Sequence, residues 1–178
     1  MTLEKNNTFT LTNNNSGESF ELPVFKGSVG PDVIDIRKLY GDTNCFTYDP
    51  GFTSTGSCES KITYIDGDEG ILLYRGYPID QLADNSDYLE TCYLLLFGDL
   101  PNQSQKESFV NDITRHTMLH EQFNTFFHGF RRDAHPMAVM ATGCSMLGNL
   151  EPEESMDAQL DSINRMVATM ASIVTYWY

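Results

Sequence analysis

The stretch from Asp49 to Ala83 limits the folds open to this chain, because the residues before it alternate like strands and those after it carry helix signals. Two apolar runs, at 62–65 and 71–74, flank the block Asp-Gly-Asp-Glu-Gly at 66–70. Glycines supply positive φ there, and aspartate side chains bond to nearby backbone amides. The stretch predicts a β-hairpin whose second strand ends at 75–78, since proline cannot donate to a sheet.

The first quarter of the chain is predicted to be rich in β-structure. Residues 1 to about 25 alternate between apolar and polar around the tract at 13–17, which indicates a hairpin with a loose turn. A short apolar piece follows at 33–36, and residues 45–48 are predicted to form another strand. We therefore divide the chain into a β-rich extension at 1–50, a hairpin junction at 51–78 and a helical part at 79–178.

Helix signals begin after Pro78. A short helical turn is expected at 79–83, and Ser86 can cap a helix over 87–97 that Gly98 ends. For the next helix, Ser104 with Glu107 three residues later predicts a capping box. Its stripe of apolar and histidine side chains continues to Phe127, with a break expected near 117–120.

Two further helices are predicted in the last third. Pro136 suits the first turn of one, and one of its faces is expected to contain Met137, Met140, Ala141, Cys144 and Leu147. Small residues at its other positions would let a neighbouring helix approach closely, within the subunit or across a dimer. An acidic linker at 151–157 leads into the last helix, which has no stop signal before Tyr178, so we expect the chain to be cut in mid-element.

Composition excludes several classes of protein. The 178 residues carry a net charge of −14 and no run of lysine and arginine, so neither nucleic acid nor an anionic membrane surface is an expected partner. No apolar run reaches the length of a signal peptide or a membrane span. The four cysteines form no C-x-x-C pair, and we expect free thiols in a cytoplasmic protein.

All four histidines lie in a window of twenty residues, at positions 116, 120, 128 and 135. His116 and His120 could share a metal on one helix face, but the zinc-helix motif needs glutamate directly after the first histidine, and here Glu121 follows the second. Local hydrogen bonding of these imidazoles is the favoured interpretation, so no metal site is predicted. The chain also has no G-x-S-x-G elbow and no phosphate-binding glycine pattern.

Two segments could contact an anion. The loop at 53–57 offers hydroxyls and amides, although a plain connection into the hairpin is the favoured alternative. The cluster Arg131-Arg132-Asp133 could clamp an anion together with Arg115 and His116, or could be a solvated loop. No complete catalytic constellation follows from the residues themselves.

Four stretches closely resemble bacterial type II citrate synthase: DVIDIR at 32–37, PGFTSTGSCESKITYIDGDEGILLYRGYPIDQLA at 50–83, TRHTMLHEQ at 114–122 and FRRDAHPMAVM at 130–140. The resemblance runs from about residue 20 to the end of the chain. It implies a mainly α, multi-helical citrate synthase-like fold, of which this chain is the N-terminal portion of the large domain, preceded by a small β-rich segment. Family members are dimers or hexamers, which implies a homo-oligomer.

The resemblance also implies a reaction. These acyltransferases condense acetyl-CoA with oxaloacetate to give citrate and CoA, at the entry to the tricarboxylic acid cycle, and they use no further cofactor. Their catalytic histidines, aspartate and substrate arginines belong to the second half of chains more than twice this length. We therefore expect a truncated piece without catalytic residues and without activity. A piece of a methylcitrate synthase acting on propionyl-CoA, and a non-catalytic scaffold or nucleotide-regulated binding domain, are the alternatives.

One regulatory feature of the family falls within this half. Many Gram-negative members are inhibited by NADH at a site remote from catalysis, and the matching positions here are Arg115, His116, Thr117 and Met118, with Arg165 as a further candidate. Two arginines and a histidine suit a pyrophosphate. The sequence departs from the family at 151–157, which is shortened, and at Thr169, where those enzymes have lysine.

Overall fold

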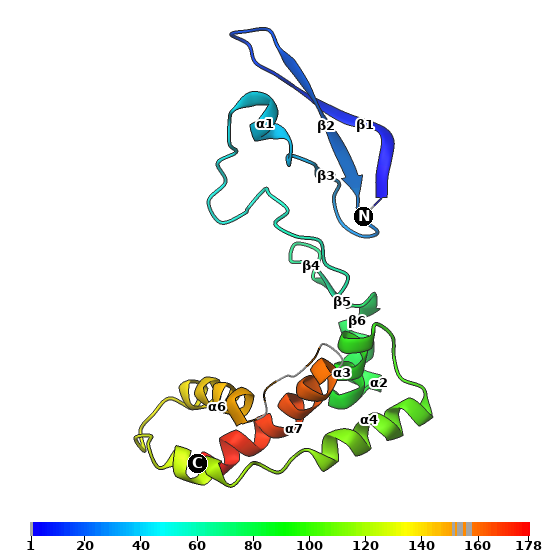
Figure 1. Cartoon of the computed structure of the whole chain (residues 1–178). Coiled ribbons are helices and arrows are strands. Elements are labelled where there is room, and N and C mark those ends of the chain that lie inside the picture. Colours follow the sequence, from blue (N-terminus) through cyan, green and yellow to red (C-terminus); the bar gives the residue numbers. More distant parts are fainter. Residues whose placement is uncertain (1, 151, 153–154, 156–157) are drawn as a thin grey trace. The chain divides into compact units, whose positions relative to one another are not determined.

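The structure is a computed structural model that describes residues 2–150, 152, 155 and 158–178 (Figure 1). The chain forms two compact units, one of residues 1–87 with 94–99 and one of residues 88–93 with 100–178. Both described sheets lie in the first unit, and most of the helical residues lie in the second. The predicted order, a β-rich beginning followed by helices, is confirmed.

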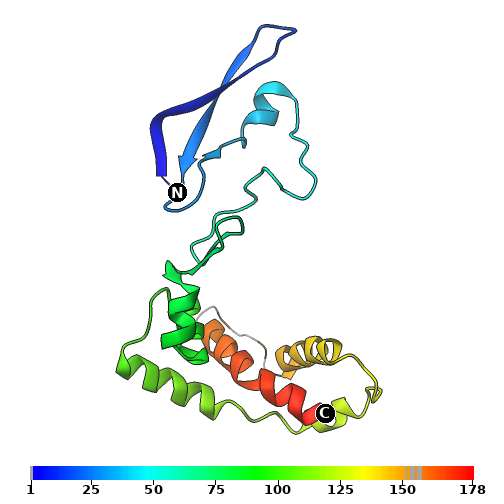
Figure 2. The same cartoon turned by 180° about the vertical axis from the view of Figure 1, so that it is seen from behind.

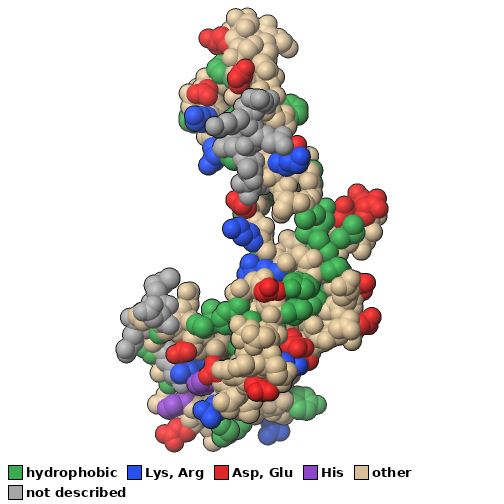
Figure 3. All heavy atoms as spheres, turned by 90° about the vertical axis from the view of Figure 1, so that its right-hand side faces the viewer, with side chains coloured by type: hydrophobic (Ala, Val, Ile, Leu, Met, Phe, Trp, Pro, Cys, Tyr) green, Lys and Arg blue, Asp and Glu red, His purple; other side chains and the backbone are tan. Residues whose placement is uncertain are grey.

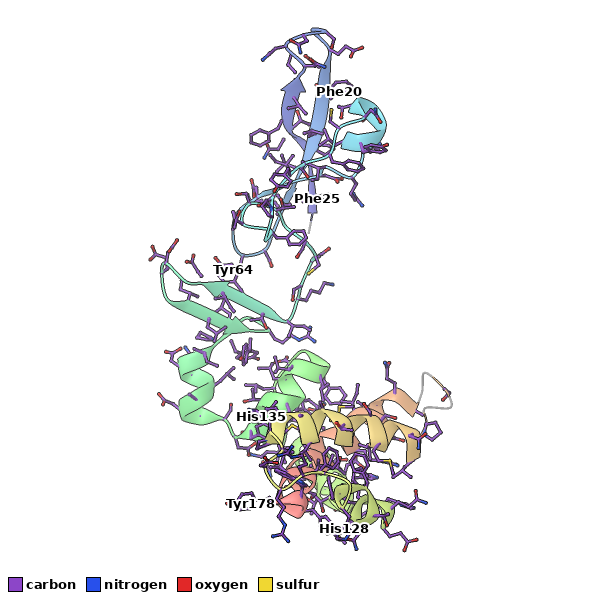
Figure 4. All side chains as sticks on the ribbon, turned by 90° about the vertical axis from the view of Figure 1, so that its left-hand side faces the viewer. Phe20, Phe25, Tyr64, His128, His135 and Tyr178 are labelled. Atoms are coloured by element: carbon purple, nitrogen blue, oxygen red, sulfur yellow. The ribbon has the colours of Figure 1, made fainter. Side chains whose placement is uncertain are left out.

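The first sheet has the strand order β1-β2-β3, formed by Thr2–Thr12, Ser19–Lys26 and Val33–Ile34. β1 and β2 are antiparallel around the predicted turn, where Asn13 Oδ1 accepts hydrogen bonds from the amides of Asn15 and Ser16 at 3.0 and 3.4 Å. The labelled Phe20 and Phe25 both lie on β2 (Figure 4). The predicted first hairpin is therefore confirmed.

The segment after this sheet differs from the prediction. The helix α1, Leu39–Thr43, was not expected, and residues 45–48 form irregular backbone instead of the predicted strand. Asn44 takes a left-handed conformation at φ 56°, which ends α1 and turns the chain. Phe46 then stacks on Tyr40 instead of extending along a sheet edge, with the ring centroids 4.3 Å apart.

The second sheet has the order β4-β5-β6, formed by Thr63–Asp66, Ile71–Tyr74 and Tyr77–Pro78. The predicted turn is present, and Asp66 Oδ1 accepts from the amides of residues 68 and 69 at 3.1 and 3.0 Å. β5 ends at Tyr74, but β6 was not predicted. Arg75 and Gly76, at φ 52° and 93°, make a two-residue turn that folds Tyr77 back onto the sheet.

The helices α2, Ile79–Asn85, and α3, Tyr88–Phe97, follow directly (Figure 2). Gly98 has φ 96°, as its predicted role at the end of α3 requires. The Arg75 guanidinium donates to the Leu95 carbonyl oxygen from Nη2 at 2.6 Å and from Nε at 3.3 Å. This contact satisfies a carbonyl in the last turn of the helix, and Leu94 beside it is fully buried.

The helix α4, Gln103–Arg115, has a capping box made by residues other than the predicted Ser104 and Glu107. The Asn102 side chain accepts from the Gln105 amide at 3.0 Å, and the Gln105 side chain accepts from the Asn102 amide at 2.9 Å. Asn102 is extended, and the helix begins directly after it. The predicted break is confirmed, because six residues separate the end of α4 from the start of α5, Gln122–Phe127.

The helices α6, Pro136–Leu150, and α7, Gln159–Trp177, pack against each other. Their core cluster consists of Phe123, Phe127, Val139, Leu147 and Ile173. The buried face of α6 contains Val139, Gly143 and Leu147, whereas the predicted face included Met137 and Ala141, which are exposed. The face with Gly143 is the buried one because glycine has no side chain there, so Ile173 of α7 can approach α6 closely. Most of the predicted linker at 151–157 lies outside the described residues.

Candidate functional site

The predicted nucleotide residues at 115–118 lie where α4 ends. Arg115 is the last residue of the helix and is exposed, and His116 is its C-terminal cap. The His116 Nδ1 atom lies 2.9 Å from the Asp112 carbonyl oxygen and 3.5 Å from Asp112 Oδ1. Thr117 and Met118 follow in the connection to α5, and both are exposed. The four residues therefore form one continuous surface segment.

Two hydrogen bonds fix the end of α4 and the segment after it to α7. The buried Asn164 donates from Nδ2 to Asp112 Oδ2 at 2.7 Å, and the Ser172 hydroxyl donates to the Thr117 carbonyl oxygen at 2.7 Å. A buried polar group is costly unless it is hydrogen-bonded, so the Asp112–Asn164 contact favours one packing of α4 on α7. The position of the segment at 115–118 is thus determined by α7 as well as by its own helix.

The remaining candidate, Arg165, lies in a different cavity. Thr117 and Met118 line a hollow of about 320 Å³ together with residues of α5 and the C-terminal half of α7. Arg165 lines another, of about 340 Å³, with Cys144 and Met166 among its neighbours. The structure therefore keeps 115–118 together, but among the described residues it does not bring Arg165 into the same cavity.

The histidines take local roles at helix ends. His120 Nδ1 accepts from the Gln122 amide at 3.2 Å, and His135 Nδ1 accepts from the Met137 amide at 3.2 Å. Since α4 ends at Arg115, His116 and His120 do not share a helix face. His128 and His135 also lie apart (Figure 4). Within the described part of the chain, no three histidine, cysteine, aspartate or glutamate side chains are placed to hold a metal ion.

In the cluster at 131–133, one of the two arginines is already paired with the aspartate of the same cluster. Arg131 donates to both carboxylate oxygens of Asp133, at 2.8 and 2.6 Å, and these hydrogen bonds lower the pKa of Asp133. Arg132 instead lines a cavity of about 570 Å³ with His128 and with Trp177 of α7. The structure therefore does not gather Arg131 and Arg132 around one anion position.

The loop at 53–57 already binds an anion of its own chain. The Asp49 carboxylate accepts hydrogen bonds from the amide and hydroxyl of Thr53 at 3.2 and 2.8 Å, from the Ser54 amide at 2.9 Å and from the Thr55 hydroxyl at 2.6 Å. These donors lower the pKa of Asp49 to about 2, the Thr55 hydroxyl contributing most. Sequence reasoning identified the donors but missed the acceptor, whose signal was an aspartate four residues before Thr53.

The Asp49 contacts predict an acid-dependent stability. The pKa of this carboxyl is lower in the folded chain than the usual value near 4, so its stabilisation is complete above about pH 5 and is lost as the pH falls towards 2. We expect the wild-type Tm to exceed that of Asp49→Asn at pH 6, and the difference to disappear near pH 2. The other carboxyls titrate in both proteins, so their effects cancel in the difference between the two Tm values. A Tm difference that stays constant from pH 6 to pH 2 would contradict the assignment.

Acidic side chains occur from one end to the other of the face in Figure 3, in keeping with the net charge of −14. Among the helices of the described residues, none combines the length and the apolar character needed to cross a bilayer.

Comparison with known proteins places the chain in a family. Residues 51–178, or 128 of 178, match the family model described as "Citrate synthase, C-terminal domain". The crystal structure of citrate synthase from Thermotoga maritima matches 74% of this chain at 27% identity, with a TM-score of 0.63. Citrate synthase from Thermoplasma acidophilum, in a ternary complex with carboxymethyl coenzyme A and oxaloacetate, matches 69% at 23% identity with a TM-score of 0.61, which shows the shared fold.

The chain spans about a third of the length of these two structures, 34% and 33%. The predicted citrate synthase-like fold is nevertheless confirmed, because both neighbours and the family model agree with the observed helices. The long match to the family model and the shared helical fold lead to one conclusion: this chain belongs to the citrate synthase family.

Proposed function

We propose that this chain is the N-terminal part of a citrate synthase of the bacterial type II kind, which condenses acetyl-CoA with oxaloacetate to give citrate and CoA. The family match over residues 51–178 carries this proposal. The chain's own contribution is structural: its polar contacts join helices, as Asp112 and Asn164 do, or stabilise a loop, as Asp49 does. The groups that bind and activate the substrates would come from the remaining two-thirds of the enzyme.

The proposal predicts no turnover by the 178-residue chain alone. We expect no CoA release when the purified chain, with its mass verified, is mixed with oxaloacetate and acetyl-CoA. The same chain joined to the remaining two-thirds of a citrate synthase, called here the joined enzyme, should release CoA. Turnover by the isolated chain would refute its structural role.

The same assay separates the two possible acyl substrates. A joined enzyme that is folded by circular dichroism but releases CoA from neither acetyl-CoA nor propionyl-CoA would refute the citrate synthase assignment. A clear preference for propionyl-CoA would instead identify a methylcitrate synthase. The two-thirds joined to this chain must therefore be taken from the same enzyme as the chain itself, so that the measured preference for one acyl-CoA is that enzyme's own.

We further propose that NADH inhibits the joined enzyme by binding at residues 115–118. Arg115 supports this site, because it is exposed at the end of α4 and makes no ion pair with a described residue. Thr117 and Met118, which follow Arg115 in the chain, border a cavity. A guanidinium in this position suits a pyrophosphate, whereas Arg165 lies in another cavity and is left out of the proposed site.

We expect Arg115→Ala to weaken NADH inhibition of the joined enzyme at least tenfold. Loss of one charge-assisted hydrogen bond costs about 1.5–3 kcal/mol, which corresponds to roughly ten- to a hundredfold in affinity. The matched control is Arg132→Ala, which removes an exposed arginine from another cavity of the same unit. Equal NADH responses of Arg115→Ala and the wild type would remove the site.

A further inference from the structure

Three sulfur-containing side chains lie together where α6 packs on α7. The Cys144 thiol of α6 donates a hydrogen bond to Met170 Sδ of α7, and the two sulfur atoms are 3.4 Å apart. Met166, one helical turn before Met170, lines a cavity of about 340 Å³ together with Cys144. These three residues, called here the sulfur cluster, bring a thiol and two thioethers to one place from two packed helices.

The sulfur cluster is not part of the apolar core. Among the described residues, the core cluster and the side chains packed against it include Met146 but no member of the sulfur cluster. Cys144 and Met170 are half-buried, and Met166 is 45% exposed. The sulfur atoms are therefore partly shielded from water, and the cavity beside Cys144 gives a small ion a path to them.

The chemistry of these side chains selects a soft cation. Thiolate and thioether sulfur suit ions such as Cu⁺, whereas Mg²⁺, Ca²⁺ and Mn²⁺ take oxygen ligands. Among the described residues, no histidine, aspartate or glutamate lines the cavity, so the ligands of harder ions are missing there. Two metal–sulfur bonds of about 2.3 Å, the length found for zinc, reach sulfur atoms up to roughly 4.6 Å apart. The separation of 3.4 Å between Cys144 Sγ and Met170 Sδ lies within that reach.

Charge favours a monovalent ion. The thiol hydrogen of Cys144 points at the Met170 sulfur. When an ion binds, the thiol releases this proton to solvent and its sulfur bonds to the ion, so the exchange of H⁺ for Cu⁺ leaves the charge of the site unchanged. Arg165 lines the same cavity, and its permanent positive charge opposes the additional charge of a divalent ion.

We propose that Cys144, Met166 and Met170 together bind one soft monovalent cation of the Cu⁺ class. Cys144 supplies the thiolate, Met170 supplies the thioether already in contact with it, and Met166 closes the site from the side of the cavity. The long, unbranched methionine side chain can turn its sulfur towards an ion without a change in the helix. This inference goes beyond the proposed function and does not depend on it.

Competition with the chelator bathocuproine disulfonate measures Cu⁺ binding under anaerobic, reducing conditions. The reference protein is the chain with Cys45, Cys58 and Cys92 replaced by serine, which leaves Cys144 as the only thiol. We expect the reference to bind one Cu⁺ per chain, and Cys144→Ser in this background to bind none. The wild type, which keeps all four thiols, should lose one bound ion on the same substitution. A folded reference that binds no Cu⁺, or that binds it equally without Cys144, would overturn the proposal.

Methionine variants distinguish a built site from a reactive thiol. Met170→Leu nearly conserves the side-chain volume but removes the sulfur, so the fold should be kept. Loss of even an outer-shell partner weakens metal binding about 10- to 100-fold, and we expect Met170→Leu to raise the Cu⁺ dissociation constant at least tenfold. Met146→Leu is the matched control, because it removes a half-buried sulfur of α6 that packs on the core cluster instead. It should leave the dissociation constant unchanged.

X-ray absorption at the copper K edge identifies the ligands directly. We expect three sulfur atoms around the ion in the reference protein and two after Met166→Leu. A dissociation constant that Met170→Leu leaves unchanged would show that the thiol binds alone, and would overturn the proposal. A ligand shell that contains histidine nitrogen, or fewer than three sulfur atoms in the reference protein, would overturn it too.

Discussion

Replacing Phe123 by alanine is expected to destabilise the helical unit by about 3–5 kcal/mol, the usual cost of removing a large buried aromatic side chain. Phe123 is 1% exposed and lies at the centre of the core cluster. Its ring centroid is 5.6 Å from that of Phe127 and 5.9 Å from that of Phe126. The substitution removes these contacts and leaves a cavity that the rigid packing of α5 on α7 cannot close.

Urea denaturation followed by tryptophan fluorescence measures this loss. Trp177 is the only tryptophan of the chain and packs against the core cluster, so its emission reports on the helical unit. Met137→Ala is the matched control, because it truncates a large apolar side chain of the same unit that is 60% exposed. It should change the free energy of unfolding by less than about 0.5 kcal/mol. Equal losses in the two variants would show that Phe123 is not central to the core.

Much of the fold could be predicted from local signals. The turn at 66–70 combines glycines with Asp66, whose side chain caps the following amides, and this chemistry acts within a few residues. Gly98 ends α3 for the same kind of reason, since its left-handed backbone conformation suits glycine. Each of these features is decided by neighbours in the sequence.

The wrong predictions concern features that depend on residues far apart in the sequence. Asn102 and Ser104 are both good helix caps, and the sequence does not say which one begins α4. α6 is apolar on most sides, so periodicity could not select the face containing Gly143 over the one containing Met137. The β6 strand depends on the two-residue turn at Arg75, whose guanidinium bonds to a helix twenty residues away.

The candidate site was predicted only in part, again because some of its contacts join residues far apart in the sequence. Residues 115–118 are consecutive, so the structure necessarily keeps them together. The hydrogen bonds that fix this region, from Asn164 to Asp112 and from Ser172 to Thr117, each join residues more than fifty positions apart and left no local signal. Arg165 was grouped with 115–118 through the family resemblance alone. Its cavity is formed by α6 and α7, and this could be learned only from the packing of these helices.

The substitution Gly143→Val is expected to destabilise the helical unit by about 1–3 kcal/mol through overpacking. A Cβ atom at position 143 would lie 2.8 Å from Ile173 Cγ2 and 3.5 Å from its Cδ1. Ile173 is completely buried, so it has no free space into which to move. Valine adds two further methyl groups, and the clash must therefore separate α6 from α7. The loss should appear in the same urea measurement.

Gly148→Val is the matched control, because it makes the same change five residues later in the same helix, where nothing lies within 4 Å of the added Cβ. Valine forms helices somewhat better than glycine, so this variant should be neutral or stabilised by up to about 0.5 kcal/mol. In the Gly143→Val background, Ile173→Ala removes the clashing methyl, so the double variant should lose less stability than the two single losses together. Additive losses would show that the glycine does not set the distance between α6 and α7.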